Sequence, residues 1–112
     1  MEKIKKYAQI VKEVLTAHIE EGGIDAPEYE LYLIADETNF NYLVCQNMWR
    51  KGTRIYGCYV HIRIKNEKVA VEYDGTNMAF ADLLFEAGIP KQDIVLAFHS
   101  PDKRPYTDFG VF

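Results

Sequence analysis

The apolar residues near the N-terminus recur at the spacing of an α-helix. The row consists of Ile4, Tyr7, Ala8, Val11, Leu15 and His18. A period near 3.6 residues places such a row on one face of a helix, which usually packs on the core of its own domain. Gly22 and Gly23 follow, and glycine accepts the left-handed conformation that closes a helix. The pattern predicts an amphipathic helix that ends before these two glycines.

Four strand-like runs come next, each rich in tyrosine, valine, isoleucine and leucine. They read YELYLIAD, NYLVCQNMW, RIYGCYVHIRIK and VAVEYD. Short turn signals separate them, at Thr38-Asn39, Lys51-Gly52 and Asn66-Glu67. Connections this short can join only antiparallel neighbours, because a parallel pair needs a crossover of roughly a dozen residues or more. We therefore expect a four-stranded antiparallel meander.

The third run shows a two-residue alternation. One set consists of Tyr56, Cys58, Val60, Ile62 and Ile64, and the other of Tyr59, His61, Arg63 and Lys65. Successive side chains of a strand point to opposite faces. We expect the first set to face the core, with Cys58 as a small core hydrophobe, and the second set to be exposed or bound.

A second helix is predicted within TNMAFADLLFEAGIP, where apolar residues again repeat at helical spacing. Thr76 or Asn77 would cap its start, and Gly88 with Pro90 would mark its end. The next run, IVLAF at residues 94–98, stays open between a short helix beginning near Pro90 and a buried strand. The expected fold class is α+β: an N-terminal helix, a four-stranded antiparallel meander, a C-terminal helix and an extended tail.

Length and composition place these elements in one domain. The chain has 112 residues, of which 48 % are hydrophobic, enough for a single core and too few for two. We therefore treat residues 1–112 as one domain. The N-terminus has no signal-peptide pattern and no apolar run approaches membrane-spanning length, so we expect a soluble cytoplasmic protein. Cys45 and Cys58 lack the spacing of a disulfide framework and are expected to be reduced.

Charge is unevenly distributed along the chain. The formal net charge is −4, which argues against a protein that coats DNA. A local basic stretch nevertheless occupies the middle of the sequence, and its candidate binding residues are Arg50, Arg54, His61, Arg63 and Lys65. These side chains could protect a sheet edge from pairing with another chain, or they could contact an anionic partner such as nucleic acid.

No motif identifies an enzyme. The histidines show no metal-binding spacing, no cofactor motif is present, and no nucleophile stands in a recognisable catalytic setting. Glu72 and Asp74 are two apart on a strand, so with His61 they could hold Mg²⁺ for a nuclease or phosphodiesterase. Asp74 is also typical of a turn residue that hydrogen-bonds its own backbone.

The C-terminal tail, residues 98–112, reads FHSPDKRPYTDFGVF and stays apolar to its last residue. Chain ends are usually polar and frayed, so this segment needs a surface to lie on. Its mixture of aromatic, arginine and apolar residues is typical of an interface. The candidate partner-binding residues are His99, Arg104, Tyr106, Thr107 and Phe109. The alternative is that the tail packs on its own sheet.

Several of these segments carry a family resemblance. The order IYGCYVHIRI, YDGT, LLFEAGIPKQDIVLAFHSP and YTDF, together with YAQIVKEVL and MWRKGTRIYGC, resembles the XisI family. These are small cyanobacterial proteins named as controlling factors for excision of the fdxN element. The similarity runs nearly from end to end of the chain.

The resemblance implies an accessory role in site-specific DNA excision, in which a separate recombinase performs the strand chemistry. Family members are commonly encoded beside XisH-like proteins, which are similar to restriction-endonuclease folds. We therefore expect a non-catalytic regulatory protein that acts with an XisH-like partner and touches DNA only within that complex. A metal-dependent nuclease and a direct nucleic-acid-binding module are the alternatives. Self-association is also expected, because a small meander leaves two sheet edges to cover.

Overall fold

The structure, a computed structural model, describes residues 2–21, 29–76 and 79–112 of the chain. The helices are α1 (Glu2–Glu21) and α2 (Phe80–Glu86), with short 3-10 helices η1 (Lys91–Asp93) and η2 (Arg104–Tyr106). The strands are β1 (Tyr29–Asp36), β2 (Asn41–Arg50), β3 (Thr53–Lys65), β4 (Lys68–Asp74) and β5 (Ile94–Leu96). Neither α1 nor α2 is both long and apolar enough to span a membrane.

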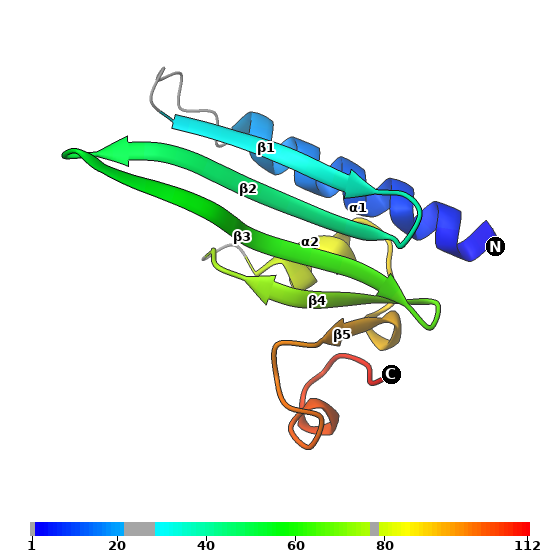
Figure 1. The fold of residues 1–112 in the computed structure, drawn as a ribbon. Coiled ribbons are helices and arrows are strands. Elements are labelled where there is room, and N and C mark those ends of the chain that lie inside the picture. The colour runs from blue at the N-terminus through cyan, green and yellow to red at the C-terminus, as the bar shows by residue number, and fades with distance from the viewer. Residues whose placement is uncertain (1, 22–28, 77–78) are drawn as a thin grey trace.

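The strands form one five-stranded sheet in the order β1-β2-β3-β4-β5, and both α-helices lie on the same side of it (Figure 1). The core fills the space between the helices and this side of the sheet. Its fully buried side chains include Val11 and Leu15 of α1, Leu84 of α2, and Val60 and Ile62 of β3. Figure 1 shows no helix over the other side of the sheet, so far as the chain is described.

The first helix forms as its apolar row predicts. Tyr7, Ala8, Val11 and Leu15 are buried, because a row with a period near 3.6 residues stays on the side of the helix that faces the sheet. The glycine stop predicted at Gly22 and Gly23 lies outside the described residues.

The predicted four-stranded meander is present, but the sheet contains one strand more than predicted. Strands β1 to β4 pair antiparallel in chain order, and turns lie at all three predicted dipeptides. The expectation of four strands was wrong, because β5 adds a fifth that runs parallel to β4. The choice left open for residues 94–98 is decided in favour of a strand at Ile94–Leu96, because the 3-10 helix that follows Pro90 ends at Asp93. The segment 75–93, which contains α2, supplies the long crossover that a parallel pair requires.

The start of α2 differs from the predicted cap. The helix begins at Phe80, after Ala79 in a left-handed conformation (φ 51°), so Thr76 is not its capping residue. Asn77 lies outside the described residues. The carboxylate of Asp74 instead accepts a hydrogen bond from the Phe80 backbone N–H at 3.0 Å. An acceptor from the preceding strand thus satisfies a donor at the helix start that has no partner within the helix.

Candidate interaction surface

The side of the sheet away from the helices carries large exposed apolar side chains. Ile34, Trp49, Tyr56 and Tyr73 are 45 %, 53 %, 62 % and 52 % exposed. The strand registers pair Asn47 with Tyr56, Trp49 with Arg54, and His61 with Tyr73 on this side. We call this surface the open face and define it by Ile34, Trp49, Arg54, Tyr56, His61, Arg63, Lys65 and Tyr73. Exposed aromatic side chains beside arginine are typical of interface cores.

A β-bulge in β3 decides which residues reach the open face. Val44 pairs with Val60, but the next residue, Cys45, pairs with Cys58, so Tyr59 is an extra residue in β3. A bulge of this kind breaks the simple alternation of side chains. Val60 and the residues after it follow the predicted alternation, whereas Cys58 is exposed.

The predicted inward set was therefore wrong for the first part of β3. Tyr56 and Cys58 are exposed, while Tyr59, predicted to be outside, packs against the core. The Tyr59 hydroxyl lies 2.8 Å from Nε2 of His18 on α1. Burial raises the pKa of Tyr59 to about 12. Gly57 was the available signal for the bulge, because an isolated glycine within a strand pattern often marks one.

Four of the five predicted basic-face residues lie on the open face. Arg54 donates from Nε to the Asn47 side chain at 2.9 Å, and its guanidinium stacks 4.4 Å from the centre of the Tyr56 ring. Lys65 lies at the other end of β3, roughly 35 Å away at about 3.3 Å per residue. Arg50 is the exception: it pairs with Thr53, next to the open-face pair of Trp49 and Arg54, so strand alternation places it on the helix side of the sheet. The basic residues are thus spread out rather than gathered in one patch.

The basic side chains of β3 do not protect an edge of the sheet. Protection of an edge strand, one of the two roles that the sequence suggests for the basic stretch, does not apply, because β3 lies between β2 and β4. Its charged side chains therefore cannot shield an edge from pairing with another chain. Acidic Glu30 lies on the same side of the sheet, in register with Asn47, which makes the open face mixed in charge.

The three residues of the possible magnesium site are not brought together as a ligand set. Asp74 Oδ1 accepts hydrogen bonds from the backbone N–H and hydroxyl of Thr76 at 3.0 and 2.7 Å, and Oδ2 accepts from Phe80 N–H. The turn role predicted for Asp74 is confirmed. Burial and the charge of Arg63 lower the pKa of His61 below its usual 6.5, while nearby Glu72 opposes the shift. Among the described residues, no group of three acidic, histidine or cysteine side chains could hold a metal ion.

Most of the predicted partner-binding residues instead hold the tail in place. Arg104 donates to the carbonyls of Ala97 and His99 at 2.9 and 3.0 Å. The Thr107 hydroxyl donates to the Arg104 carbonyl at 2.9 Å and accepts from Phe109 N–H at 3.2 Å. Phe109 packs against the core and the ring of His99 packs beside that of Phe98.

Tyr106 is the exception in the tail, because it is 90 % exposed. At the end of the chain, Phe112 lies under Lys65 and Arg104, with 5.3 and 5.5 Å between each cation and the ring centre. The tail therefore packs on its own domain, the alternative left open by the sequence, and leaves Tyr106 as the side chain best placed to contact another molecule.

Gly110 fixes the tail to the sheet and was missed in the sequence. It forms a parallel bridge with Val95 of β5, and its N–H donates to the carbonyls of Ile94 and Lys91 at 2.8 and 3.0 Å. A Cβ at this position would lie 2.0 Å from the Gln92 carbonyl oxygen. A glycine between Phe109 and Val111 in an apolar segment was the one available signal.

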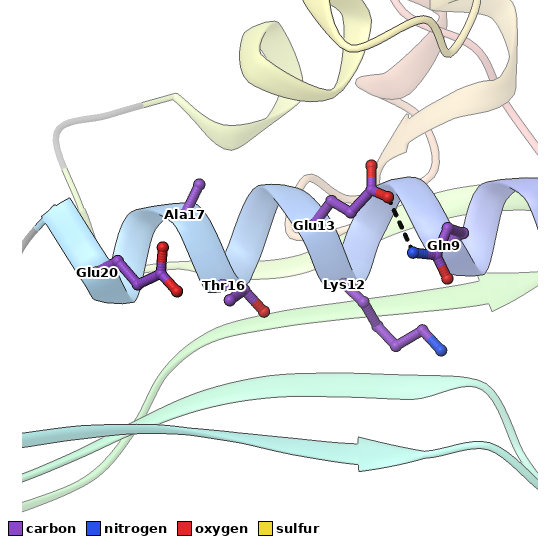
Figure 2. Close-up of a pocket in the computed structure, with 6 residues that line it drawn as sticks. All are labelled: Gln9, Lys12, Glu13, Thr16, Ala17 and Glu20. Atoms are coloured by element: carbon purple, nitrogen blue, oxygen red, sulfur yellow. Dashed lines mark hydrogen bonds between the residues drawn. The ribbon is translucent and has the colours of Figure 1, made fainter.

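A shallow hollow of about 390 Å³ lies along the exposed side of α1. Its lining residues are Gln9, Lys12, Glu13, Thr16, Ala17 and Glu20. Figure 2 shows that all of them come from this one helix, where Gln9 donates a hydrogen bond to Glu13 at 2.8 Å. Ligand sites are usually enclosed by several elements with apolar walls. The hollow therefore adds no binding chemistry to that of the open face and the tail.

Comparison with known proteins gives consistent matches along nearly the whole chain. The sequence profile described as XisI protein matches residues 1–111. A crystal structure of a XisI-like protein from Anabaena variabilis is 34 % identical, with a TM-score of 0.90 over 97 % of this chain and 99 % of that one. The fdxN element excision controlling factor XisI from the same organism is 31 % identical, with a TM-score of 0.82 over 98 % and 99 % of the two chains. A comparison with curated proteins gives no match.

Proposed function

The chain belongs to the XisI family, and from this membership we propose that it is a non-catalytic accessory protein that acts with an XisH-like partner in site-specific excision of a DNA element. The observation that carries the proposal is its similarity, over 98 % of the chain, to a protein described as an excision controlling factor. The hydrogen bonds that occupy the Asp74 carboxylate favour an accessory role over metal-dependent cleavage.

The partner is proposed to contact the open face. Trp, Tyr and Arg dominate the binding energy of protein interfaces, and a few such residues supply most of it. Trp49, Arg54 and Tyr56 provide this combination at one end of the sheet, where Arg54 lies over the Tyr56 ring. Tyr106, which projects from the tail, is a second candidate contact.

The test is co-purification of the full chain with the XisH-like protein, followed by titration. A stoichiometric complex is expected, and Trp49→Ala or Tyr56→Ala should weaken it roughly 30-fold or more, the effect of losing about 2 kcal/mol at a hot spot. Phe85→Ala is the matched control, since Phe85 is 44 % exposed on α2, on the helix side of the sheet. Absence of a complex at micromolar concentration would refute the accessory role with this partner. Equal weakening by all three variants would refute the placement on the open face.

Binding of single-stranded nucleic acid is a second candidate function. The stacked Arg54 and Tyr56 beside Trp49 favour it, because bases stack on exposed aromatic side chains within basic grooves. The single tryptophan makes fluorescence quenching by an oligonucleotide a direct assay. Quenching that weakens steeply with salt is expected of phosphate contacts. Its absence at low salt would exclude this function.

A further inference from the structure

The two edges of the sheet are closed to different extents. At one edge, β5 is covered by the tail, where Gly110 bridges Val95 and donates to the Ile94 carbonyl. At the other edge, β1 is the last strand, and no described strand pairs with its outer side. Unpaired backbone N–H and C=O groups along such a strand are a template for a further strand.

The composition of β1 offers little protection against that pairing, since Glu30 and Asp36 are its only charged residues. Natural edge strands are protected by charged side chains, above all lysine, or by proline, bulges or very short length. The sequence of β1, YELYLIAD, contains no lysine, arginine or proline, and the strand is eight residues long. Its pairing with β2 runs without a bulge from Tyr29 to Asp36. A strand of this length and regularity, with six uncharged residues between and beside two acidic ones, has the features of a strand that can pair with another chain.

We propose that β1 pairs antiparallel with β1 of a second copy about a twofold axis at Tyr32, which joins the two sheets into one. This register is self-complementary, since it places Leu31 opposite Leu33 and Glu30 opposite Ile34 of the other copy. An axis at Leu33 would instead set Glu30 directly opposite Asp36 inside both strands, and like charges so placed are destabilising. With the axis at Tyr32, the acidic partner of Asp36 is Glu28, which precedes β1 in the sequence.

The pairing also accounts for an exposed side chain. Ile34 is 45 % exposed in the single chain, and a second β1 strand would cover it from the side. Both copies would present their open faces on the same side of the joined sheet, because the twofold axis is perpendicular to it. The inference does not depend on the proposed function, and it identifies the second copy as the occupant of this edge.

The register can be tested by a charge exchange. In sedimentation equilibrium the full chain is expected to have twice the 13.0 kDa mass of one chain. Ile34→Glu places a new carboxylate opposite Glu30 of the other copy, and the twofold axis repeats this like-charge pair, so the dimer contains two of them. The substitution should weaken association at least tenfold. Adding Glu30→Lys to Ile34→Glu should restore it. Tyr73→Glu is the matched control, at an exposed open-face position on β4, and circular dichroism checks the fold of each variant.

A monomer at concentrations up to about 100 μM would overturn the proposal, as would an Ile34→Glu variant that remains dimeric with an intact fold. Failure of the Glu30→Lys exchange to restore the dimer would overturn the register at Tyr32. Hydrogen exchange supplies a second readout, because dilution below the dissociation range should release protection of amides within β1. A dimer whose β1 amides are insensitive to dilution would place the contact elsewhere. If a monomer gained β1 protection only with the XisH-like protein, the occupant would be that partner rather than a second copy.

Discussion

Substitution of Gly110 by alanine tests whether the tail is part of the folded domain. The added Cβ would lie 2.0 Å from the Gln92 carbonyl oxygen, and backbone atoms cannot move aside as a flexible side chain can. The tail would therefore have to leave its position on β5. Both hydrogen bonds of the Gly110 N–H would then be lost, and Val95, which is fully buried, would be partly exposed.

The expected loss of stability follows from these contacts. The single Gly110 N–H is shared between two carbonyls, and this bifurcated hydrogen bond contributes about 1 kcal/mol. Full exposure of a valine side chain would cost roughly 1.5–3 kcal/mol, of which only part applies because Val95 keeps its contacts within the sheet. We expect Gly110→Ala to lower the free energy of unfolding by about 1–3 kcal/mol. At about 4 °C per kcal/mol for a chain of this size, the melting temperature should fall by roughly 4–12 °C.

Urea unfolding followed by far-ultraviolet circular dichroism measures this effect. The midpoint should fall while the slope stays close to that of the natural chain, since the same core unfolds. Asp108→Ala is the control, because Asp108 is an exposed residue of the same tail and should change stability by less than about 0.5 kcal/mol. If Gly110→Ala also stayed within that range, the tail would contribute nothing to the domain and the account of β5 as a closed edge would be wrong.

Two further predictions concern ionisation. Burial alone would raise the pKa of Asp93, but the hydrogen bond from the Tyr7 hydroxyl and the ion pair with Lys3 bring it below the usual value. The carboxylate therefore stabilises the fold above roughly pH 4, and that stabilisation is lost as the pH falls through the lower pKa of the folded state. Tyr7→Phe should reduce the difference in unfolding free energy between pH 7 and pH 3, and an unchanged difference in urea titrations would contradict this. Glu72→Gln should lower the pKa of His61 further, because it removes the charge that opposes the shift, and a proton NMR titration that finds an equal or higher pKa would contradict it.

The sequence predicted those parts of the fold that depend on local periodicity and turn chemistry. The apolar row of α1 and the turn dipeptides between β1 and β4 each act over a few residues, and each was found as expected. The alternation in β3 was correct only from Val60 onward. Gly57 is a local sign of a bulge, but the position of the extra residue at Tyr59 depends on the pairing of β3 with β2, which one strand's own pattern does not contain.

The structures of the tail and of β5 could not be predicted from local patterns either, because both depend on contacts with other parts of the chain. A run of five apolar residues fits either a helix or a strand, and only pairing with β4 makes Ile94 to Leu96 a strand. Arg104 looked like an interface residue because its bonding partners, the carbonyls of Ala97 and His99, are backbone groups that composition does not reveal. Tyr106, predicted on the same grounds, is exposed, and its proposed contact with a partner is still a prediction.

The bulge connects the stability of the domain to its candidate interaction surface. By turning inward, Tyr59 reaches His18 of α1, and its carbonyl accepts a hydrogen bond from Gly75 N–H at 2.7 Å, which positions the chain that leads to α2. The extra residue also turns Tyr56 and Cys58 outward, so an aromatic side chain stands on the open face instead of in the core. Without the bulge, the alternation set by Val60 would bury Tyr56 and expose Tyr59. The feature that links the sheet to both helices therefore also supplies the exposed tyrosine beside Arg54, and selection for a stable core would preserve the surface with which we propose a partner is bound.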